Sequence, residues 1–195
     1  MLICIIHKEI NVINQYIELV RNNIKPNFRI AEVGVFEGGS ARYIFPLLKE
    51  VTGSFVAVDS WEAVSEHAFL SASASWEKYR DIRQGISWEV AEQFPNDSFD
   101  FVFIDASHRY SNVVRDIRAW LPKVKVGGIL AGHDYNRMWA GELDNTDDDV
   151  SEREHCGVSR AVREVFGDGF SHTVTPHLAD VETWWVVITE SHKHD

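Results

Sequence analysis

Short runs of apolar residues alternate along the chain with longer stretches in which apolar residues recur every three or four positions. An apolar run of four to eight residues is typical of a strand buried on both faces, and the longer spacing is typical of an amphipathic helix. Their alternation indicates βαβ units and a parallel sheet covered by helices on both faces. Buried strands are predicted over residues 29–35, 54–59, 99–105 and 128–131.

Amphipathic patterns predict the helices, and weaker apolar runs predict the other strands. The helices are expected over residues 11–23, 40–51, 111–124 and 157–166, and the further strands over 80–86, 170–174 and 183–189. A chain of 195 residues suits one domain, so residues 1–195 are expected to form a single unit. The predicted fold class is α/β: a Rossmann-like, doubly wound, mostly parallel seven-stranded sheet with an antiparallel C-terminal strand.

A glycine-containing segment, Glu32 to Ser40 (EVGVFEGGS), joins the first predicted strand to a helix. Its glycines allow a tight turn and a close approach of the backbone to a ligand, as in nucleotide-binding loops. Phe36 stands where a dinucleotide-binding loop has the glycine that lets a pyrophosphate approach. The acid at Glu32 also disfavours phosphate, so a dinucleotide is the poorer ligand for this loop.

The acids around this loop suit a ligand that has an ammonium group, a ribose and an adenine but no phosphate. A carboxylate at Glu32 can pair with an ammonium group. Asp59 ends the next strand about 20 residues after Gly38, near the offset at which a carboxylate takes the ribose hydroxyls. S-adenosylmethionine has this combination of groups. The alternative interpretation of the segment is a glycine turn beside two solvated acids that bind no ligand.

On these residues the chain resembles the class I S-adenosylmethionine-dependent methyltransferases. Residues 32–40 resemble their first motif and residues 55–59 their second, and the likeness continues through 85–87 and 101–105. Residues 105–110 and 127–135 make the chain similar to small bacterial methyltransferases related to catechol O-methyltransferase and to sugar or macrolide O-methyltransferases. The resemblance covers roughly residues 28 to 190.

The resemblance implies a cofactor site and a reaction. Gly34, Phe36 and Ser40 would hold the methionine part, Asp59 the ribose, and Ser87 and Trp88 the adenine. The full set of expected cofactor contacts is Glu32, Gly34, Phe36, Gly38, Ser40, Asp59, Ser60, Ser87, Trp88 and Asp105. The expected reaction is methylation of a small hydroxylated molecule, most simply on oxygen, with nitrogen as an alternative acceptor atom.

Methyl transfer to a hydroxyl requires a group that makes the hydroxyl oxygen more anionic. His108 follows Asp105 by three residues, where the catechol-type relatives have a catalytic lysine, and an imidazole is a suitable base at neutral pH. We therefore expect His108 and Asp105 to be the catalytic residues. The alternative for His108 is a structural role at the start of the following helix.

A divalent cation is the second device that could activate the hydroxyl. Asp105 and Asp134 end separate strands and, together with His133, could hold magnesium or manganese. The relatives have an acid and an amide where this chain has His133 and Asp134. An imidazole ligand would favour manganese, iron or zinc over magnesium; otherwise His133 is no ligand and the enzyme works without metal.

Charge and composition limit the classes of partner that the protein is expected to bind. The chain has 19 Lys and Arg against 30 Asp and Glu, a formal charge of −11, which disfavours nucleic acid and anionic membranes. Cys4 and Cys156 form no CxxC pair, and the apolar start is too short for a signal peptide or a membrane span, so a cytoplasmic setting is expected. The expected partner is a small-molecule methyl acceptor, with a homodimer closing the pocket.

Two insertions, residues 60–79 and 136–155, are expected to be substrate lids or solvated surface. Two other functions stay open at this point. A nicotinamide-dependent oxidoreductase is disfavoured by Phe36 and by the lack of a Tyr-x-x-x-Lys pair. A relative that binds S-adenosylmethionine but is non-catalytic, or catalyses a different reaction, would share the fold.

Overall fold

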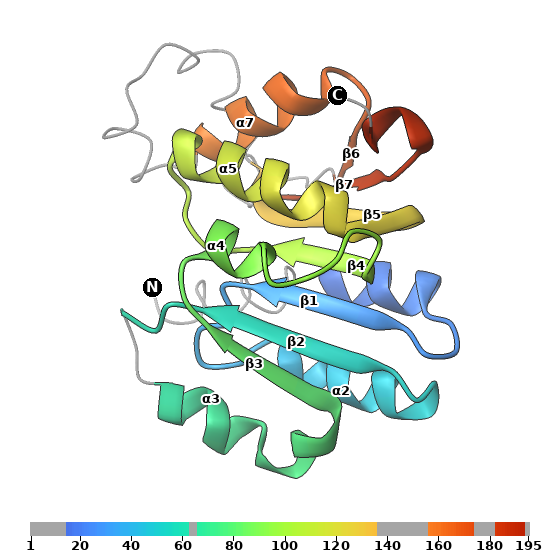
Figure 1. The fold of residues 1–195 in the computed structure, drawn as a ribbon, viewed down its shortest axis with the longest axis vertical. Coiled ribbons are helices and arrows are strands. Elements are labelled where there is room, and N and C mark those ends of the chain that lie inside the picture. The colour runs from blue at the N-terminus through green and yellow to red at the C-terminus, as the bar shows by residue number, and fades with distance from the viewer. Residues whose placement is uncertain (1–14, 63–65, 136–155, 174–181, 194–195) are drawn as a thin grey trace.

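The computed structural model describes residues 15–62, 66–135, 156–173 and 182–193, and it contains one seven-stranded sheet (Figure 1). The strand order is β3-β2-β1-β4-β5-β7-β6. Strands β1 to β5 pair in parallel, and β7 alone runs antiparallel to β5. The strands are β1 (Arg29–Val33), β2 (Ser54–Asp59), β3 (Arg80–Gln84), β4 (Phe99–Ile104), β5 (Val124–Tyr135), β6 (Ser171–His172) and β7 (Glu182–Val187). The predicted fold class is confirmed.

Helices cover both faces of the sheet. One face carries α4 (Ser87–Ala91), α5 (Tyr110–Trp120) and α7 (Cys156–Phe166), and the other carries the helix over residues 15–23, α2 (Ala41–Glu50) and α3 (Glu66–Ala72). Every residue of β4 is buried, because its alternate side chains enter the cores on opposite faces. Among the described helices, none is both long and apolar enough to cross a bilayer.

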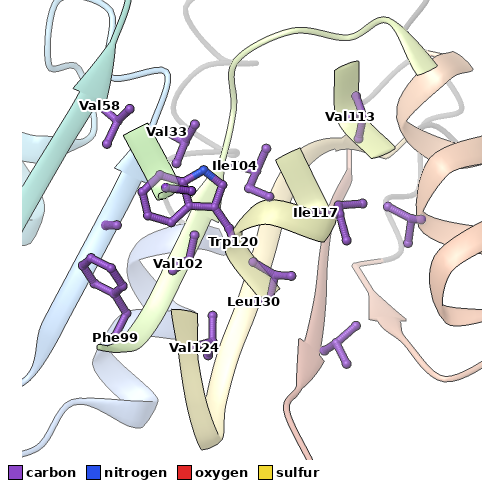
Figure 2. Packing of buried hydrophobic residues seen from close by; sticks show 14 of the residues in the cluster. Val33, Val58, Phe99, Val102, Ile104, Val113, Ile117, Trp120, Val124 and Leu130 are labelled. Carbon is purple, nitrogen blue, oxygen red and sulfur yellow. The ribbon is translucent and has the colours of Figure 1, made fainter. Parts of the chain in front are cut away.

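Trp120 is one of two fully buried tryptophans, with Trp184, in the core under α5 (Figure 2). It is fully buried and packs against Phe99 and Phe94, with ring centroids 5.8 and 5.9 Å away. Its indole nitrogen donates a hydrogen bond to the Ser87 hydroxyl at 2.9 Å. The core thereby fixes the position of α4 and of the loop before it.

The strand order reverses at β1, which lies between β2 and β4. In doubly wound sheets a ligand binds outside the carboxyl ends of the strands at such a reversal. Hydrogen bonds continue the sheet beyond these ends: Gly34 N–H donates to the Val58 carbonyl and Asp105 N–H to the Val33 carbonyl, both at 2.7 Å. The loops after β1, β2 and β4 therefore start from one rigid edge.

Several element boundaries differ from the sequence prediction, and two of these differences have a clear local basis. The helix expected over 111–124 ends at Trp120 and continues as a 3-10 turn, Leu121–Lys123, because Pro122 has no N–H to extend an α-helix. Strand β5 begins at Val124 rather than at residue 128, and a register shift between Phe99 and Phe101 accommodates the added length. The sequence prediction also missed α4.

Of the two predicted insertions, the structure describes most of residues 60–79 but not residues 136–155. Within residues 60–79 the structure shows α3 and a 3-10 helix, Ala74–Tyr79, packed beside α2. Residues 136–155, and the segment that holds Cys4, lie outside the described residues, as does the side chain of Cys156.

A buried ion-pair cluster joins the amino-terminal ends of the central strands. The Asp100 side chain is 2% exposed and lies 2.9 Å from both the Lys25 and the Lys125 ammonium groups, and Arg29 N–H donates to it at 2.9 Å. Burial alone would raise the pKa of Asp100, but these three partners outweigh it and lower the pKa. The charged carboxylate therefore stabilises the folded state.

We expect Asp100→Asn to lower the free energy of unfolding at pH 7 by about 1–3 kcal/mol, because it removes the charge that the lysines and the amide stabilise. The wild-type advantage should be complete above about pH 5 and shrink as the pH falls through the lowered pKa of the native carboxyl, since protonation removes the same charge. Urea denaturation at several pH values measures the difference. The half-buried Asp81, whose side chain is 42% exposed and pairs with Arg83 at 2.8 Å, provides the control Asp81→Asn, for which little change is expected.

Candidate functional site

A cavity of about 620 Å³ opens at the carboxyl ends of β1, β2, β3 and β4. This volume lies within the usual range for small-molecule and cofactor sites. The lining residues come from the ends of β1 and β2, the loops after these four strands, the start of α4 and one face of α5. They are Val33, Gly34, Phe36, Val58, Asp59, Ser60, Glu62, Gly85, Ile86, Ser87, Trp88, Asp105, Ala106, Ser107, Asn112 and Asp116.

The loop after β1 requires glycine at position 34. Gly34 has a φ of +92°, and a Cβ atom there would lie 2.1 Å from the carbonyl oxygen of Asp105. Gly38, with a φ of +82°, turns the chain into α2 where a Cβ would lie 2.9 Å from the Phe69 ring. Phe36 has a left-handed backbone with φ +48°, and its side chain is 53% exposed at the cavity.

Asp59 holds this loop and lines the cavity. One carboxylate oxygen accepts a hydrogen bond from Phe36 N–H at 2.8 Å, and the other accepts one from Trp61 N–H at 2.7 Å. A carboxylate can accept about four hydrogen bonds, so each oxygen can still accept one from a ligand hydroxyl. Asp59 thus lines the cavity, and its contact to a ribose stays a prediction.

Glu32 does not line the cavity. Its side chain is buried and accepts hydrogen bonds from the Tyr16 hydroxyl at 3.1 Å and from the Ser40 hydroxyl. Burial raises the pKa of Glu32 to about 8, even though these two bonds act to lower it. Gly38 and Ser40 are likewise absent from the lining. Glu32 links Ser40, at the end of the loop, to Tyr16 in the helix over residues 15–23.

The other end of the cavity contains predicted and unpredicted residues. Ser87 and Trp88 line it as predicted, together with Ser60. Asn112 and Asp116, four residues apart on α5, also line it and were missed. The available signal was an acid among the apolar positions of an amphipathic helix. Trp61 instead packs against Phe69 and donates to the Phe36 carbonyl at 3.2 Å, so it supports the loop.

Four titratable side chains gather beside the cavity, two from the loop after β4 and two from β5. His108 Nε2 lies 2.7 Å from Asp134 Oδ2. His133 Nδ1 lies 3.4 Å from Asp134 Oδ1 and 3.6 Å from Asp105 Oδ1. Asp105 lines the large cavity and also the small adjoining pocket that His108, His133 and Asp134 line.

The two histidines and the buried acid of this cluster influence one another's pKa values. Burial acts to lower the pKa of both histidines, but the adjacent carboxylates outweigh it. The pKa of His108 is raised, chiefly by Asp134, and the pKa of His133 is raised to about 10 by Asp105 and Asp134. Burial raises the pKa of Asp134, but the two imidazoles outweigh it and lower the pKa well below its usual range.

The geometry favours a different metal-ligand set from the predicted one. The sequence prediction grouped Asp105, His133 and Asp134. In the structure, one ligand atom each from Asp105, His108 and Asp134 lie within 4.8 Å of one another. The Nε2 atom of His133 is buried and has no hydrogen-bond partner among the described residues.

The fold and this site define a class I S-adenosylmethionine-dependent methyltransferase. Residues 31–135, more than half of the chain, match the model of a family described as a methyltransferase domain, and the chain belongs to that family. The methyltransferase activity expected from the motifs is thereby confirmed, and the oxidoreductase alternative loses its support. Among curated proteins, none matches the sequence.

Several solved structures share the fold. A proposed O-methyltransferase from Klebsiella pneumoniae has a TM-score of 0.69 at 20% identity, over 89% of this chain and 78% of that one. The O-methyltransferase TomG from Streptomyces achromogenes, solved with S-adenosylmethionine, has a TM-score of 0.66 at 20% identity, over 88% and 77%. A proposed caffeoyl-CoA O-methyltransferase from Staphylococcus aureus has a TM-score of 0.63 at 17% identity, over 90% and 82%.

We expect Gly34→Ala to lower the free energy of unfolding by at least about 2 kcal/mol and to abolish binding of S-adenosylhomocysteine, because Cβ meets the Asp105 carbonyl. Gly39→Ala is the matched control, since a Cβ there meets nothing within 4 Å. It should change stability by no more than about 0.5 kcal/mol. Urea denaturation and titration calorimetry measure both effects, and equal behaviour of the two variants would contradict the prediction.

Proposed function

We propose that this methyltransferase methylates an oxygen atom of a small hydroxylated molecule, with His108 as the general base. The observation that carries the proposal is the position of Asp105, which lines both the large cavity and the pocket of the His108–Asp134 pair. A cofactor in the cavity would thus lie beside the base His108 and its partner Asp134. The names of the structural neighbours as O-methyltransferases agree with oxygen as the acceptor atom.

The cofactor would lie across the ends of the first three strands. Gly34 and Phe36 would contact its methionine part, Asp59 and Ser60 its ribose, and Ser87 and Trp88 its adenine. Asp105 would border the reacting end. Glu32, Gly38 and Ser40 would act indirectly in this arrangement, by holding the loop that carries Gly34 and Phe36.

His108 is oriented for proton transfer. The 2.7 Å contact with Asp134 fixes one ring nitrogen and stabilises the imidazolium that forms when His108 takes the acceptor proton. The acceptor oxygen then bonds to the methyl carbon as the carbon–sulfur bond breaks, and the bonding pair goes to the sulfonium sulfur. The products are a methyl ether and S-adenosylhomocysteine, with the proton on His108.

A divalent cation is a second candidate for hydroxyl activation, favoured by the cluster of Asp105, His108 and Asp134. Two carboxylates and one imidazole form a donor set that suits manganese better than magnesium. When bound, the cation would lower the pKa of a coordinated hydroxyl. His108 would then be a ligand rather than the base, so the two candidates exclude each other.

The composition of the chain supports a small-molecule acceptor rather than nucleic acid, because the net charge of −11 opposes a phosphate backbone. A cytoplasmic setting, a homodimer, the single-domain organisation and the lid role of residues 60–79 and 136–155 stay predictions.

A screen for transfer of a tritiated methyl group to phenols, sugars and amines tests the acceptor class. We expect label in at least one hydroxylated acceptor and none in amines without a hydroxyl. Each acceptor is tested with EDTA and with added manganese or magnesium. Activity that survives EDTA supports His108 as the base, whereas loss with EDTA and recovery with manganese supports the metal.

We expect His108→Gln to lower kcat by about 100-fold or more, because removal of a general base has this magnitude, and to leave the Kd for S-adenosylhomocysteine unchanged. His192→Gln is the matched control, because His192 contacts Thr189 near the C-terminus and lies outside the cavity lining. Steady-state kinetics and calorimetry measure both. A variant with wild-type kcat would exclude His108 as the base.

A further inference from the structure

Ser107 lies at the border between the large cavity and the small pocket that contains the proposed base. Three residues line both spaces, and they are Asp105, Ala106 and Ser107. A carboxylate can only accept hydrogen bonds and alanine has no polar side-chain atom, so Ser107 supplies the side-chain donor of this shared wall. The residue is half-buried, and a ligand in either space can therefore reach it.

Two N–H groups occupy the lone pairs of the Ser107 hydroxyl. The side-chain amide of Asn112 donates to Ser107 Oγ at 3.1 Å, and Arg109 N–H donates to the same atom at 3.3 Å. A serine hydroxyl has two lone pairs and one proton, so these bonds use its whole capacity as an acceptor. Both donors lie at the start of α5, and the hydroxyl proton therefore points away from this helix. Among the described residues, none accepts that proton.

A donor at this border acts on the charge that develops during methyl transfer. As His108 takes the acceptor proton in the proposed function, the acceptor oxygen becomes more negative beside the carboxylates of Asp105 and Asp134. A fixed donor directed at such an oxygen stabilises the transition state more than the ground state. The hydroxyl of Ser107 is already oriented for this bond, because its other two hydrogen bonds are made by the protein.

We propose that the Ser107 hydroxyl donates a hydrogen bond to the acceptor oxygen and so makes the site select hydroxyl over amine acceptors. A neutral amine has one lone pair, which it uses to attack the methyl carbon, so it cannot accept this bond at the same time. A hydroxyl oxygen keeps a further lone pair during the attack. The Ser107 proton stays on Ser107, and the acceptor proton goes to His108. The inference rests on the proposed function with His108 as the base, and it adds the residue that selects oxygen.

The Ser107→Ala variant tests the inference with the hydroxylated acceptor that takes up the most label in the tritium screen. We expect kcat to fall about 10- to 100-fold, the effect of losing a hydrogen bond to a charged group, while the Kd for S-adenosylhomocysteine stays unchanged in calorimetry. Ser98→Ala is the matched control, because Ser98 donates to the Pro95 carbonyl at 2.6 Å and lies outside the cavity lining. A wild-type kcat for Ser107→Ala would overturn the inference alone. Wild-type protein that labels no hydroxylated acceptor would overturn the proposed function as well.

The Asn112→Asp variant separates this role from a structural one. Arg109 N–H can still donate to Ser107, but the new carboxylate can only accept, so the Ser107 hydroxyl should turn and donate to it. We expect kcat to fall as it does in Ser107→Ala. Because the added charge could also slow the reaction, Asn112→Asp is made in the Ser107→Ala background, where it should have little further effect. Fully additive effects, or a wild-type kcat for Asn112→Asp, would limit Ser107 to holding the start of α5 and overturn the inference.

The product ratio with 2-aminophenol tests the selection of oxygen directly, because a hydroxyl and an amine compete on one ring. Wild-type protein should form the O-methylated product. Ser107→Ala should lower the ratio of O- to N-methylated product at least about tenfold, since it removes the bond that only the oxygen can accept. The ratio does not depend on how much of the variant is folded, so it decides even if the variant is unstable. An unchanged ratio would contradict the proposed role of Ser107.

Discussion

The close approach of two backbone segments at the reversal of strand order is the constraint on which the site depends. Gly34 and the Asp105 carbonyl lie so near each other that no side chain fits between them. This contact follows from the topology, because β1 lies between β2 and β4 and both neighbours are parallel to it. It places the loop that would hold a cofactor directly beside the loop that carries Asp105 and His108. In the proposed function, the donor and acceptor sites would therefore be adjacent as a consequence of the sheet topology.

The acids at the site, Glu32, Asp116 and Asp59, differ in how many hydrogen bonds the protein itself donates to them. Glu32 and Asp116 are both buried, and burial raises the pKa of both. The two Glu32 oxygens are occupied by Tyr16 and Ser40, whereas one oxygen of Asp116 lacks a partner in the described structure. A buried polar group without a partner is unfavourable. Glu32 therefore has all the hydrogen bonds that its burial requires, whereas Asp116 does not. Asp59 is intermediate, since its carboxylate accepts hydrogen bonds from two backbone amides and can still accept further hydrogen bonds.

The sequence predicted the sheet and the loop well because both depend on local patterns. Buried strands appear as apolar runs, and a glycine turn between strand and helix is visible without any tertiary information. The roles of individual acids were harder to predict, because they depend on residues distant in the sequence. Tyr16 bonds to Glu32 from the helix over residues 15–23, and Asp116 lines the cavity from α5. The geometry groups His108, rather than the predicted His133, with Asp105 and Asp134, and this difference has a similar cause. Asp134 has a left-handed backbone, φ +60°, and β5 shifts register between Gly132 and Tyr135. Simple strand alternation does not predict either feature.

The two candidates for activating the acceptor depend on the same side chains, His108 and Asp134. His133 lies between Asp105 and Asp134, and its raised pKa makes it a cation that offsets part of their charge. A divalent cation bound to Asp105, His108 and Asp134 would need His108 neutral and would repel the His133 imidazolium, so its binding would be coupled to proton release. Without the metal, the same imidazolium balances the carboxylates and leaves Asp134 to orient His108. In the proposed reaction without a metal, the protonated His133 would thus offset part of the negative charge of Asp105 and Asp134.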